Sequence, residues 1–304
     1  MQESKLKNYL LLHLIVFIWG FTAILGALIT IDAIPLVWYR MLLAVLFIAI
    51  YFLWKKKTFK VDRKGLVKFF FTGFVIALHW VFFFKAIKVS NVSVALVTMS
   101  TGAFFTALIE PVFFKRKINT LEIFLGVLVI GGLYIIFNFE SQYKLGIIYA
   151  LIASFLGALF AVLNGLFIKK YTAEIISFYQ LFFGVVVITM YLLFTNQFTV
   201  SFFQIPTLDW WYLLILSSVC TAYAFIASVE VMKYLSPYTV MLTINLEPIY
   251  AIILALFIFG DEEQMSATFY LGAFIVLSVV LLNGIIKNRG TLKEKFQQIL
   301  KRKK

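Results

Sequence analysis

The chain alternates between long apolar stretches and short polar connections. Ten apolar stretches can be traced, at about residues 9–29, 35–54, 68–87, 92–114, 121–139, 145–168, 175–194, 210–231, 237–259 and 268–286. A helix needs about 20 apolar residues to cross the hydrocarbon core of a bilayer, and most of the ten approach that length. The pattern therefore predicts an all-α integral membrane protein with ten transmembrane helices. Because the first stretch lacks a small-residue cleavage site and further stretches follow at once, we expect it to be retained as a helix.

Composition agrees with this class, since hydrophobic residues make up 63% of the chain and charged residues 13%, unlike soluble domains. The formal net charge of +13 could indicate a nucleic-acid partner. However, the basic residues lie between apolar stretches and at the C-terminus, as on the cytoplasmic face of a membrane protein. We therefore expect a lipid bilayer and no nucleic acid as partner. One cysteine, Cys220, and two histidines give no reason to expect a metal or a cofactor.

The positions of the charges predict the orientation. With the N-terminus inside, most of the 27 Lys and Arg residues fall on the inner side, whereas outer connections carry Asp32, Glu140, Asp209 and the acidic run 261–263. The positive-inside rule then predicts a multi-pass protein of the cell membrane with both termini in the cytoplasm. Residues 291–304 are expected to form a basic amphipathic tail on the inner leaflet. The oligomeric state, a homodimer included, stays open.

The second half of the sequence repeats the first. Residues 88–96 align with 233–241, and the match continues through the following helix, which predicts two five-helix repeats, 1–140 and 141–290. Because five is odd, the second repeat must cross the membrane in the opposite sense. Inverted repeats with a site at their interface are typical of secondary transporters. A gene duplication without transport is the alternative.

A carboxylate and a proline interrupt the stretch 237–259. Glu247 at membrane depth is costly unless it faces protein or water, and Pro248 should free the carbonyl of Ile244 and kink the helix. A broken helix with an ionisable group indicates a transporter binding site, although a structural kink with a capped Glu is the alternative. Asn245 lies two residues before Glu247, so in a straight helix only one of them faces the cavity. We prefer Glu247 for that position.

Further polar or aromatic side chains at membrane depth extend the predicted site. His79 could bind a substrate carboxylate or relay a proton, or be a neutral hydrogen-bonded interior group. Trp19 offers an aromatic face and a donor, or only packs. The predicted substrate-binding residues are Trp19, Thr22, His79, Thr98, Thr101, Asn164, Tyr179, Tyr223, Asn245 and Glu247. Glu247 and His79 are the candidates for proton coupling, and no catalytic residue is predicted.

Several of these side chains have plain structural alternatives. The hydroxyls of Thr98 and Thr101 can bond to their own helix backbone. Tyr223 is expected near mid-membrane, on one stripe with Cys220 and Ala227. Arg40, also inside an apolar stretch, is expected to extend to the membrane surface or make a structural contact, with an anion contact as the weaker alternative.

The order and spacing of several short motifs resemble the drug/metabolite transporter superfamily, EamA type. The motifs are Phe17-Ile-Trp19-Gly20, Tyr39-Arg40, Phe84-Lys-Ala-Ile-Lys-Val-Ser-Asn91, Leu256-Phe-Ile-Phe-Gly-Asp-Glu262 and Gly272. The resemblance implies a ten-helix exporter or permease for small metabolites such as amino acids, with a central cavity between the halves. The first half has Gly102-Ala103 where the second has Glu247-Pro248, so the two halves cannot supply equivalent carboxylates.

Two functions of different class follow. The first is a secondary transporter that binds a small metabolite between the halves and moves it across the membrane by alternating access. Whether this transport is coupled to protons stays open. The sequence has no phosphate-binding Gly-Lys-Ser/Thr loop, so direct use of ATP by this chain is not expected. The second is an intramembrane enzyme acting on lipid-linked substrates, which would need acid–base pairs or metal ligands at one depth.

Overall fold

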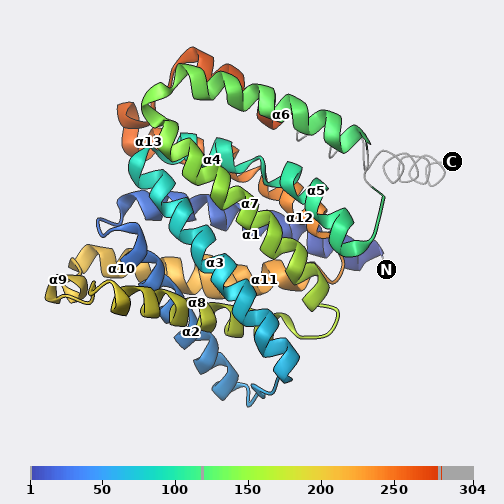
Figure 1. The fold of residues 1–304 in the computed structure, drawn as a ribbon, viewed down its shortest axis with the longest axis vertical. Coiled ribbons are helices and arrows are strands. Elements are labelled where there is room, and N and C mark those ends of the chain that lie inside the picture. Colours follow the sequence, from blue (N-terminus) through green and yellow to red (C-terminus); the bar gives the residue numbers. More distant parts are fainter. Residues whose placement is uncertain (1, 118–119, 280–281, 283–304) are drawn as a thin grey trace.

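The computed structural model describes residues 2–117, 120–279 and 282, and all regular secondary structure within them is helical (Figure 1). In the first half the helices are α1 (Gln2–Leu28), α2 (Ala33–Trp54), α3 (Arg63–Val89), α4 (Val92–Met99), α5 (Gly102–Phe114) and α6 (Thr120–Phe139). In the second half they are α7 (Lys144–Phe167), α8 (Ala173–Phe194), α9 (Val200–Phe203), α10 (Thr207–Ser217), α11 (Ala224–Val231), α12 (Pro237–Ile244) and α13 (Glu247–Phe259), followed by a helix at 267–279.

Eight helical segments of the described chain are long and apolar enough to cross a membrane. They are Leu6–Leu28, Ala33–Trp54, Arg63–Val89, Val92–Phe114, Ser141–Phe167, Ala173–Phe194, Thr207–Val231 and Pro237–Phe259. Two shorter apolar helices, Ile123–Asn138 and Ala267–Val279, fall on the remaining two predicted stretches. Large apolar side chains such as Trp54, Phe257 and Phe274 are exposed on the outside, a surface suited to lipid. The predicted tail at 291–304 lies outside the described residues.

Three of the eight segments are interrupted within their length. The segment Val92–Phe114 divides into α4 and α5 at Ser100 and Thr101, and Pro237–Phe259 divides into α12 and α13 at Asn245 and Leu246. Pro248 lies in the first turn of α13, where its missing amide hydrogen breaks no helical bond. The predicted kink is therefore a complete interruption.

The third discontinuous segment is Thr207–Val231. Between α10 and α11 it forms a π-helical turn, Ser218–Tyr223. A π-turn inserts an extra residue into the helical repeat, so every side chain beyond it is rotated relative to a regular helix. This rotation decides which side chains of the segment face the interior.

The helices pack around a centre formed by the broken segments. α3 lies against α7 and α8, whereas α4 contacts α13 and α5 contacts α12. The broken segments cross closely, because a Cβ added at Gly102 would lie 2.6 Å from Cε of Met241. In Figure 1, α6 and the red helix at 267–279 run together along one edge of the molecule, away from α2 and α8. The centre is therefore enclosed by helices from both halves.

Carboxylates join the two halves at one end of the bundle, which we call the Asp62 end. Asp62, at the start of α3, accepts hydrogen bonds from Nζ of Lys170 (2.8 Å) and the hydroxyl of Tyr171 (2.5 Å). Glu110, near the end of α5, accepts from the backbone N–H of Tyr238 (2.8 Å), in the first turn of α12. Asp62 and Glu110, which belong to the first half, thus bond to residues of the second half.

The opposite end, which we call the Asp209 end, has the reciprocal contacts. Asp209, in the first turn of α10, accepts from the backbone N–H (2.9 Å) and hydroxyl (2.8 Å) of Thr30. Glu263 accepts from the backbone N–H groups of Val92 (2.8 Å) and Ser93 (3.0 Å), where α4 begins. Helix N-terminal N–H groups lack partners within the helix and favour negative charge. Each half therefore supplies carboxylates that complete the helix ends of the other.

We predict that the edge of the bundle depends on the glycine pair where α6 crosses the helix at 267–279. A Cβ at Gly132 would lie 2.8 Å from Cγ2 of Val276 and 3.1 Å from the carbonyl of Gly272. Gly132→Val should destabilise the protein by about 1–3 kcal/mol through overpacking, measured by thermal unfolding in detergent. Gly131→Val is the matched control because nothing lies within 4 Å of a Cβ there. Equal melting temperatures for the two variants would contradict this packing.

We also predict the pH dependence of the contact at the Asp62 end. Hydrogen bonds from Lys170 and Tyr171 lower the pKa of the Asp62 carboxyl to about 2. Because the folded pKa lies below the unfolded one, the stabilisation is complete above about pH 4 and is lost as the pH falls towards 2. Asp62→Asn should lower the melting temperature by the same amount at pH 5 and pH 8. If the loss in melting temperature caused by Asp62→Asn differs between pH 5 and pH 8, another group titrates at this contact.

Candidate functional site

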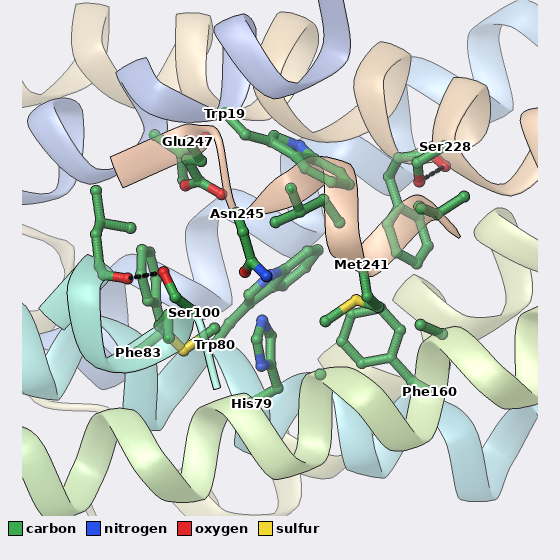
Figure 2. Close-up of a pocket in the computed structure, with 18 of the residues that line it drawn as sticks. Trp19, His79, Trp80, Phe83, Ser100, Phe160, Ser228, Met241, Asn245 and Glu247 are labelled. Carbon is green, nitrogen blue, oxygen red and sulfur yellow. Dashed lines mark hydrogen bonds between the residues drawn. The ribbon is translucent and has the colours of Figure 1, made fainter. Parts of the chain in front are cut away.

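A cavity of about 100 Å³ lies where the broken segments meet (Figure 2). Its walls come from α1, α2, α3, α7 and α11 and from the interruptions of both broken segments. Ser100 and Asn245, the residues at which α4 and α12 end, both line it. Freed backbone groups at membrane depth need partners from protein or water. The backbone N–H groups of Ser100, Thr101 and Leu246 bond to carbonyls of their own turns, so the polar groups that the cavity offers are side chains such as those of Asn245 and Glu247.

Both Asn245 and Glu247 face the cavity. Figure 2 shows their side chains pointing, together with that of His79, towards the same central space. In a straight helix only one of the two could do so, but the interruption at residues 245–246 changes the direction of the chain between them. Glu247 also lies in the first turn of α13, where the helix dipole favours a carboxylate. The interruption thus supplies both a carboxylate and an amide to one site.

His79 lies in the cavity wall contributed by α3 and is held by the backbone of α7. Its Nδ1 lies 2.6 Å from the carbonyl oxygen of Ala153. A carbonyl only accepts, so Nδ1 carries a proton and the neutral tautomer leaves Nε2 as an acceptor. Gly157, one turn further along α7, leaves room for the ring, since a Cβ there would lie 3.1 Å from Cε1 of His79.

Trp19 is placed by the π-helical turn. Its Nε1 donates to the backbone carbonyl of Cys220 at 3.1 Å, within the turn Ser218–Tyr223. The same turn explains a difference from the sequence prediction. Cys220 and Ala227 are buried, whereas the side chain of Tyr223 is 48% exposed. The extra residue of the π-turn rotates Tyr223 away from the predicted stripe and out of the cavity.

Six of the ten predicted binding residues line the cavity, and four do not. Those in the lining are Trp19, Thr22, His79, Asn164, Asn245 and Glu247. Those outside it are Thr98, Thr101, Tyr179 and Tyr223. The hydroxyl of Thr101 bonds to the carbonyl of Thr98 at 2.8 Å, as its alternative anticipated, whereas the hydroxyl of Thr98 has no partner in the described chain. The hydroxyl of Tyr179 donates to the carbonyl of Phe59 at 2.6 Å and holds a connection at the Asp62 end.

Arg40 also lines the cavity, although it was not among the predicted binding residues. Its side chain neither extends to the surface nor pairs with a carboxylate, because it is 2% exposed and forms no ion pair within the described chain. The guanidinium carbon lies 4.0 Å from the ring centroid of Trp80. An arginine inside an apolar stretch was the available signal. Its contacts come from α3 and from the π-helical turn Ser218–Tyr223, which are distant in sequence.

Other membrane-region carboxylates lie away from the cavity. Glu110 bonds to Tyr238 and to Arg116 (3.2 Å), and Glu230 pairs with Lys233 (2.7 Å). Among the described residues, Glu247 is the one carboxylate in the cavity lining, and no three His, Cys, Asp or Glu side chains gather as a metal site. The described cavity thus has one carboxylate and one imidazole rather than an acid–base carboxylate pair.

Membrane-length helices interrupted around an internal cavity are typical of multi-pass membrane transporters. The profile of the EamA-like transporter family matches residues 6–138 and again residues 144–285. The chain therefore belongs to this family, within the drug/metabolite transporter superfamily.

Relatives named as transporters agree with this assignment, and a solved structure shares the fold. A Bacillus subtilis (strain 168) protein named uncharacterized transporter YxxF is 22% identical over 300 residues, covering 95% of this chain and 93% of its own. An uncharacterized transporter of Archaeoglobus fulgidus is 24% identical over 285 residues, covering 91% and 96%. A crystal structure with 11% identity superposes with a TM-score of 0.67 over 90% of this chain and 96% of the other, which supports the fold alone.

We predict that water reaches Ser100 but not Thr98, although both are buried in the same segment. In a Cys220→Ala background, which has no other cysteine, Ser100→Cys should react with a small water-soluble methanethiosulfonate at least tenfold faster than Thr98→Cys. The reason is that these reagents need a thiolate in water, and of the two residues Ser100 lines the cavity. Equal rates would contradict the placement of the cavity.

Proposed function

We propose that the protein is a secondary transporter that carries a small metabolite across the cell membrane by alternating access. Its ten spans form two inverted five-helix repeats, 1–140 and 141–290, with both termini in the cytoplasm. The observation that carries the proposal is the cavity at the meeting point of two interrupted helices, one from each half. Half-helix ends at membrane depth provide partners for polar solutes and ions.

The two halves correspond in their helix lengths and in the positions of residues with positive φ, which supports the proposal of two repeats. α4 and α12 each have 8 residues, and α5 and α13 each have 13. The described chain has four residues of positive φ, and they fall at matching places: Lys56 and Asn196 follow α2 and α8, and Lys115 and Gly260 follow α5 and α13. The family profile also matches each half separately. Positive φ is uncommon outside glycine, so its occurrence at both Lys56 and Asn196 favours a shared ancestral unit.

The contacts at the two ends support alternation between the halves. At each end, carboxylates of one half bond to backbone N–H groups or side chains of the other. Such contacts are local and polar, so one end can separate while the other stays closed. In the proposed cycle, the Asp62 end opens to the cytoplasm and the Asp209 end to the outside.

The solute site is formed by the cavity, with Glu247 and His79 as the groups that can exchange protons with it. Arg40 is the third charged or titratable group in the lining. Amino acids are the metabolites that the family resemblance favours. Binding and release of a proton at Glu247 would couple solute movement to a proton gradient, because a buried carboxylate changes its interactions with both solute and Arg40 when it is neutralised.

The inverted topology predicts that equivalent turns lie on opposite sides of the membrane. In the Cys220→Ala background, Lys56→Cys and Asn196→Cys should be labelled differently in intact cells by a membrane-impermeant maleimide. We expect labelling of Asn196→Cys and protection of Lys56→Cys until the cells are permeabilised. Labelling of both variants from the same side would rule out inversion.

Transport itself is tested in proteoliposomes with a panel of labelled metabolites, with and without a pH gradient. We expect flux of at least one compound, and at least a tenfold loss in Glu247→Gln because the variant removes the cavity carboxylate. Glu230→Gln is the matched control, since Glu230 pairs with Lys233 away from the cavity. Wild-type flux in Glu247→Gln would make Glu247 structural. Absence of flux for every compound would favour the enzyme alternative.

A further inference from the structure

A second pocket, of about 740 Å³, opens at the Asp209 end of the bundle, and we call it the Lys85 pocket. It is lined by the connection between α1 and α2, by the last turns of α3 and by the connection that leads from α8 into α9. We propose that this pocket binds the headgroup of an anionic phospholipid, with Lys85 and Lys88 receiving the phosphate. The inference concerns a site apart from the central cavity and does not depend on the proposed transport function.

Two of the three basic residues at the Asp209 end gather in the Lys85 pocket. The helix ends and connections of this end carry Lys85, Lys88 and Lys144, against six acidic residues, which are Asp32, Glu140, Asp209 and the run 261–263. The lining contains both Lys85 and Lys88 but, within the described chain, one carboxylate, that of Asp32. The pocket is therefore a positively charged place on an end that is otherwise acidic.

Both lysines of the pocket have N–H groups available for an anion. Lys85 and Lys88 lie three residues apart in the last two turns of α3, so they share one face of that helix. Neither forms an ion pair within the described chain. Lys88 donates one hydrogen bond to the carbonyl of Ile29, and an ammonium has three N–H donors. The carboxylate of Asp209 lies outside the lining and accepts from the backbone N–H and hydroxyl of Thr30.

The connection after α8 indicates that the pocket lies at the depth of lipid headgroups. Its aromatic residues Phe198 and Phe202 pack against Trp38 of α2, with ring centroids 5.8 Å and 5.4 Å away. Its polar residues in the pocket lining are Asn196, Gln197, Thr199 and Ser201. Trp210 and Trp211, near the start of α10 at the same end, are exposed. Because tryptophan side chains are enriched at the membrane–water boundary, we place this end of the bundle, and the pocket in it, at that boundary.

An apolar surface suited to acyl chains adjoins the polar pocket. In α9, which projects from the edge of the molecule in Figure 1, Val200 and Phe203 are 76% and 58% exposed. Thr199 and Ser201, their neighbours in sequence, line the pocket. Basic pockets beside transmembrane helices bind anionic lipid headgroups, and a phospholipid joins such a headgroup to acyl chains. A soluble anion would make no use of the apolar surface, so the two features together favour a phospholipid.

Both halves of the chain contribute to the Lys85 pocket. The connection between α1 and α2 and the end of α3 belong to the first half, whereas Tyr149 of α7 and the connection after α8 belong to the second. Thr30, whose hydroxyl bonds to Asp209 of the second half, is itself part of the lining. We therefore expect a bound lipid to contact both halves and to stabilise the closed Asp209 end.

The test measures whether a lipid shields a cysteine in the pocket. In the Cys220→Ala background, Ser201→Cys provides a thiol in the lining, and Leu208→Cys provides an exposed reference outside the lining at the same end. The rate of maleimide labelling of each variant is measured in nanodiscs of phosphatidylcholine, with and without phosphatidylglycerol. Phosphatidylglycerol should slow the labelling of Ser201→Cys at least threefold relative to Leu208→Cys. The reference corrects for the general effect of an anionic surface on thiol reactivity.

Lysine variants test whether the shielding depends on the charge of the pocket. Lys85→Gln should raise the phosphatidylglycerol content needed for half-maximal shielding of Ser201→Cys about fivefold, and Lys85→Glu should abolish the shielding. Lys144→Gln and Lys144→Glu are the matched controls, because Lys144 starts α7 at the same end but lies outside the lining. If Lys85→Glu does not fold, Lys85→Gln decides. Shielding that is unchanged in Lys85→Gln, or reduced equally in Lys144→Gln, would overturn the role of Lys85.

Further measurements identify the occupant as a lipid. Glycerophosphate and inorganic phosphate, which lack acyl chains, are added at millimolar concentration to nanodiscs of phosphatidylcholine alone, and they should leave the labelling of Ser201→Cys unchanged. Shielding by either compound equal to that by phosphatidylglycerol would indicate a site for soluble anions and overturn the lipid assignment. Absence of shielding by phosphatidylglycerol would also overturn it. None of these measurements requires flux, so their outcome is independent of the proposed transport function.

Discussion

The interruption of two helices inside an apolar environment is the constraint on which the rest of this structure depends. A continuous helix satisfies its own backbone hydrogen bonds, but a break at membrane depth leaves N–H and C=O groups that lipid cannot satisfy. The breaks at Ser100–Thr101 and Asn245–Leu246 must therefore face protein or an aqueous cavity. Packing α4 against α13 and α5 against α12 brings the two breaks together, and the cavity is formed where they meet.

The ends of the same broken segments are completed by carboxylates from the opposite half. Glu110 bonds to the start of α12, and Glu263 bonds to the start of α4. Glu110 and Glu263 do not align with each other when the two repeats are aligned. A carboxylate contact to the start of a broken segment is therefore made in both directions, but from a different position in each half. Besides the packing of α3 against α7 and α8, the halves are thus joined at both ends by a few polar bonds, and the cavity lies between these ends. Such an arrangement suits a protein whose ends separate one at a time.

Much of the fold could be predicted from the sequence, because apolar stretches of membrane length and a carboxylate beside a proline are local signals. Nine of the ten apolar stretches lie wholly within the described chain and coincide with its helices. The site was less predictable because the prediction assumed regular helices. The interruption at residues 245–246 brings both Asn245 and Glu247 to the cavity, and the π-turn rotates Tyr223 to the outside. The structural contact predicted for Arg40 is confirmed by its hydrogen bond to Thr221 and its stacking on Trp80, but its partners and its place in the cavity wall could not be predicted because only the tertiary fold brings these residues together.

The most direct test of the central claim, that the two ends open alternately around the cavity, is a distance measurement by double electron–electron resonance. In the Cys220→Ala background, spin labels at Lys64 and Lys169 report on the Asp62 end, and labels at Asp32 and Leu208 report on the Asp209 end; all four positions are exposed. Under conditions that favour opposite-facing states, with and without transported solute, the two distance distributions should shift in opposite directions. Distributions that stay fixed, or that lengthen together, would contradict alternation between the halves.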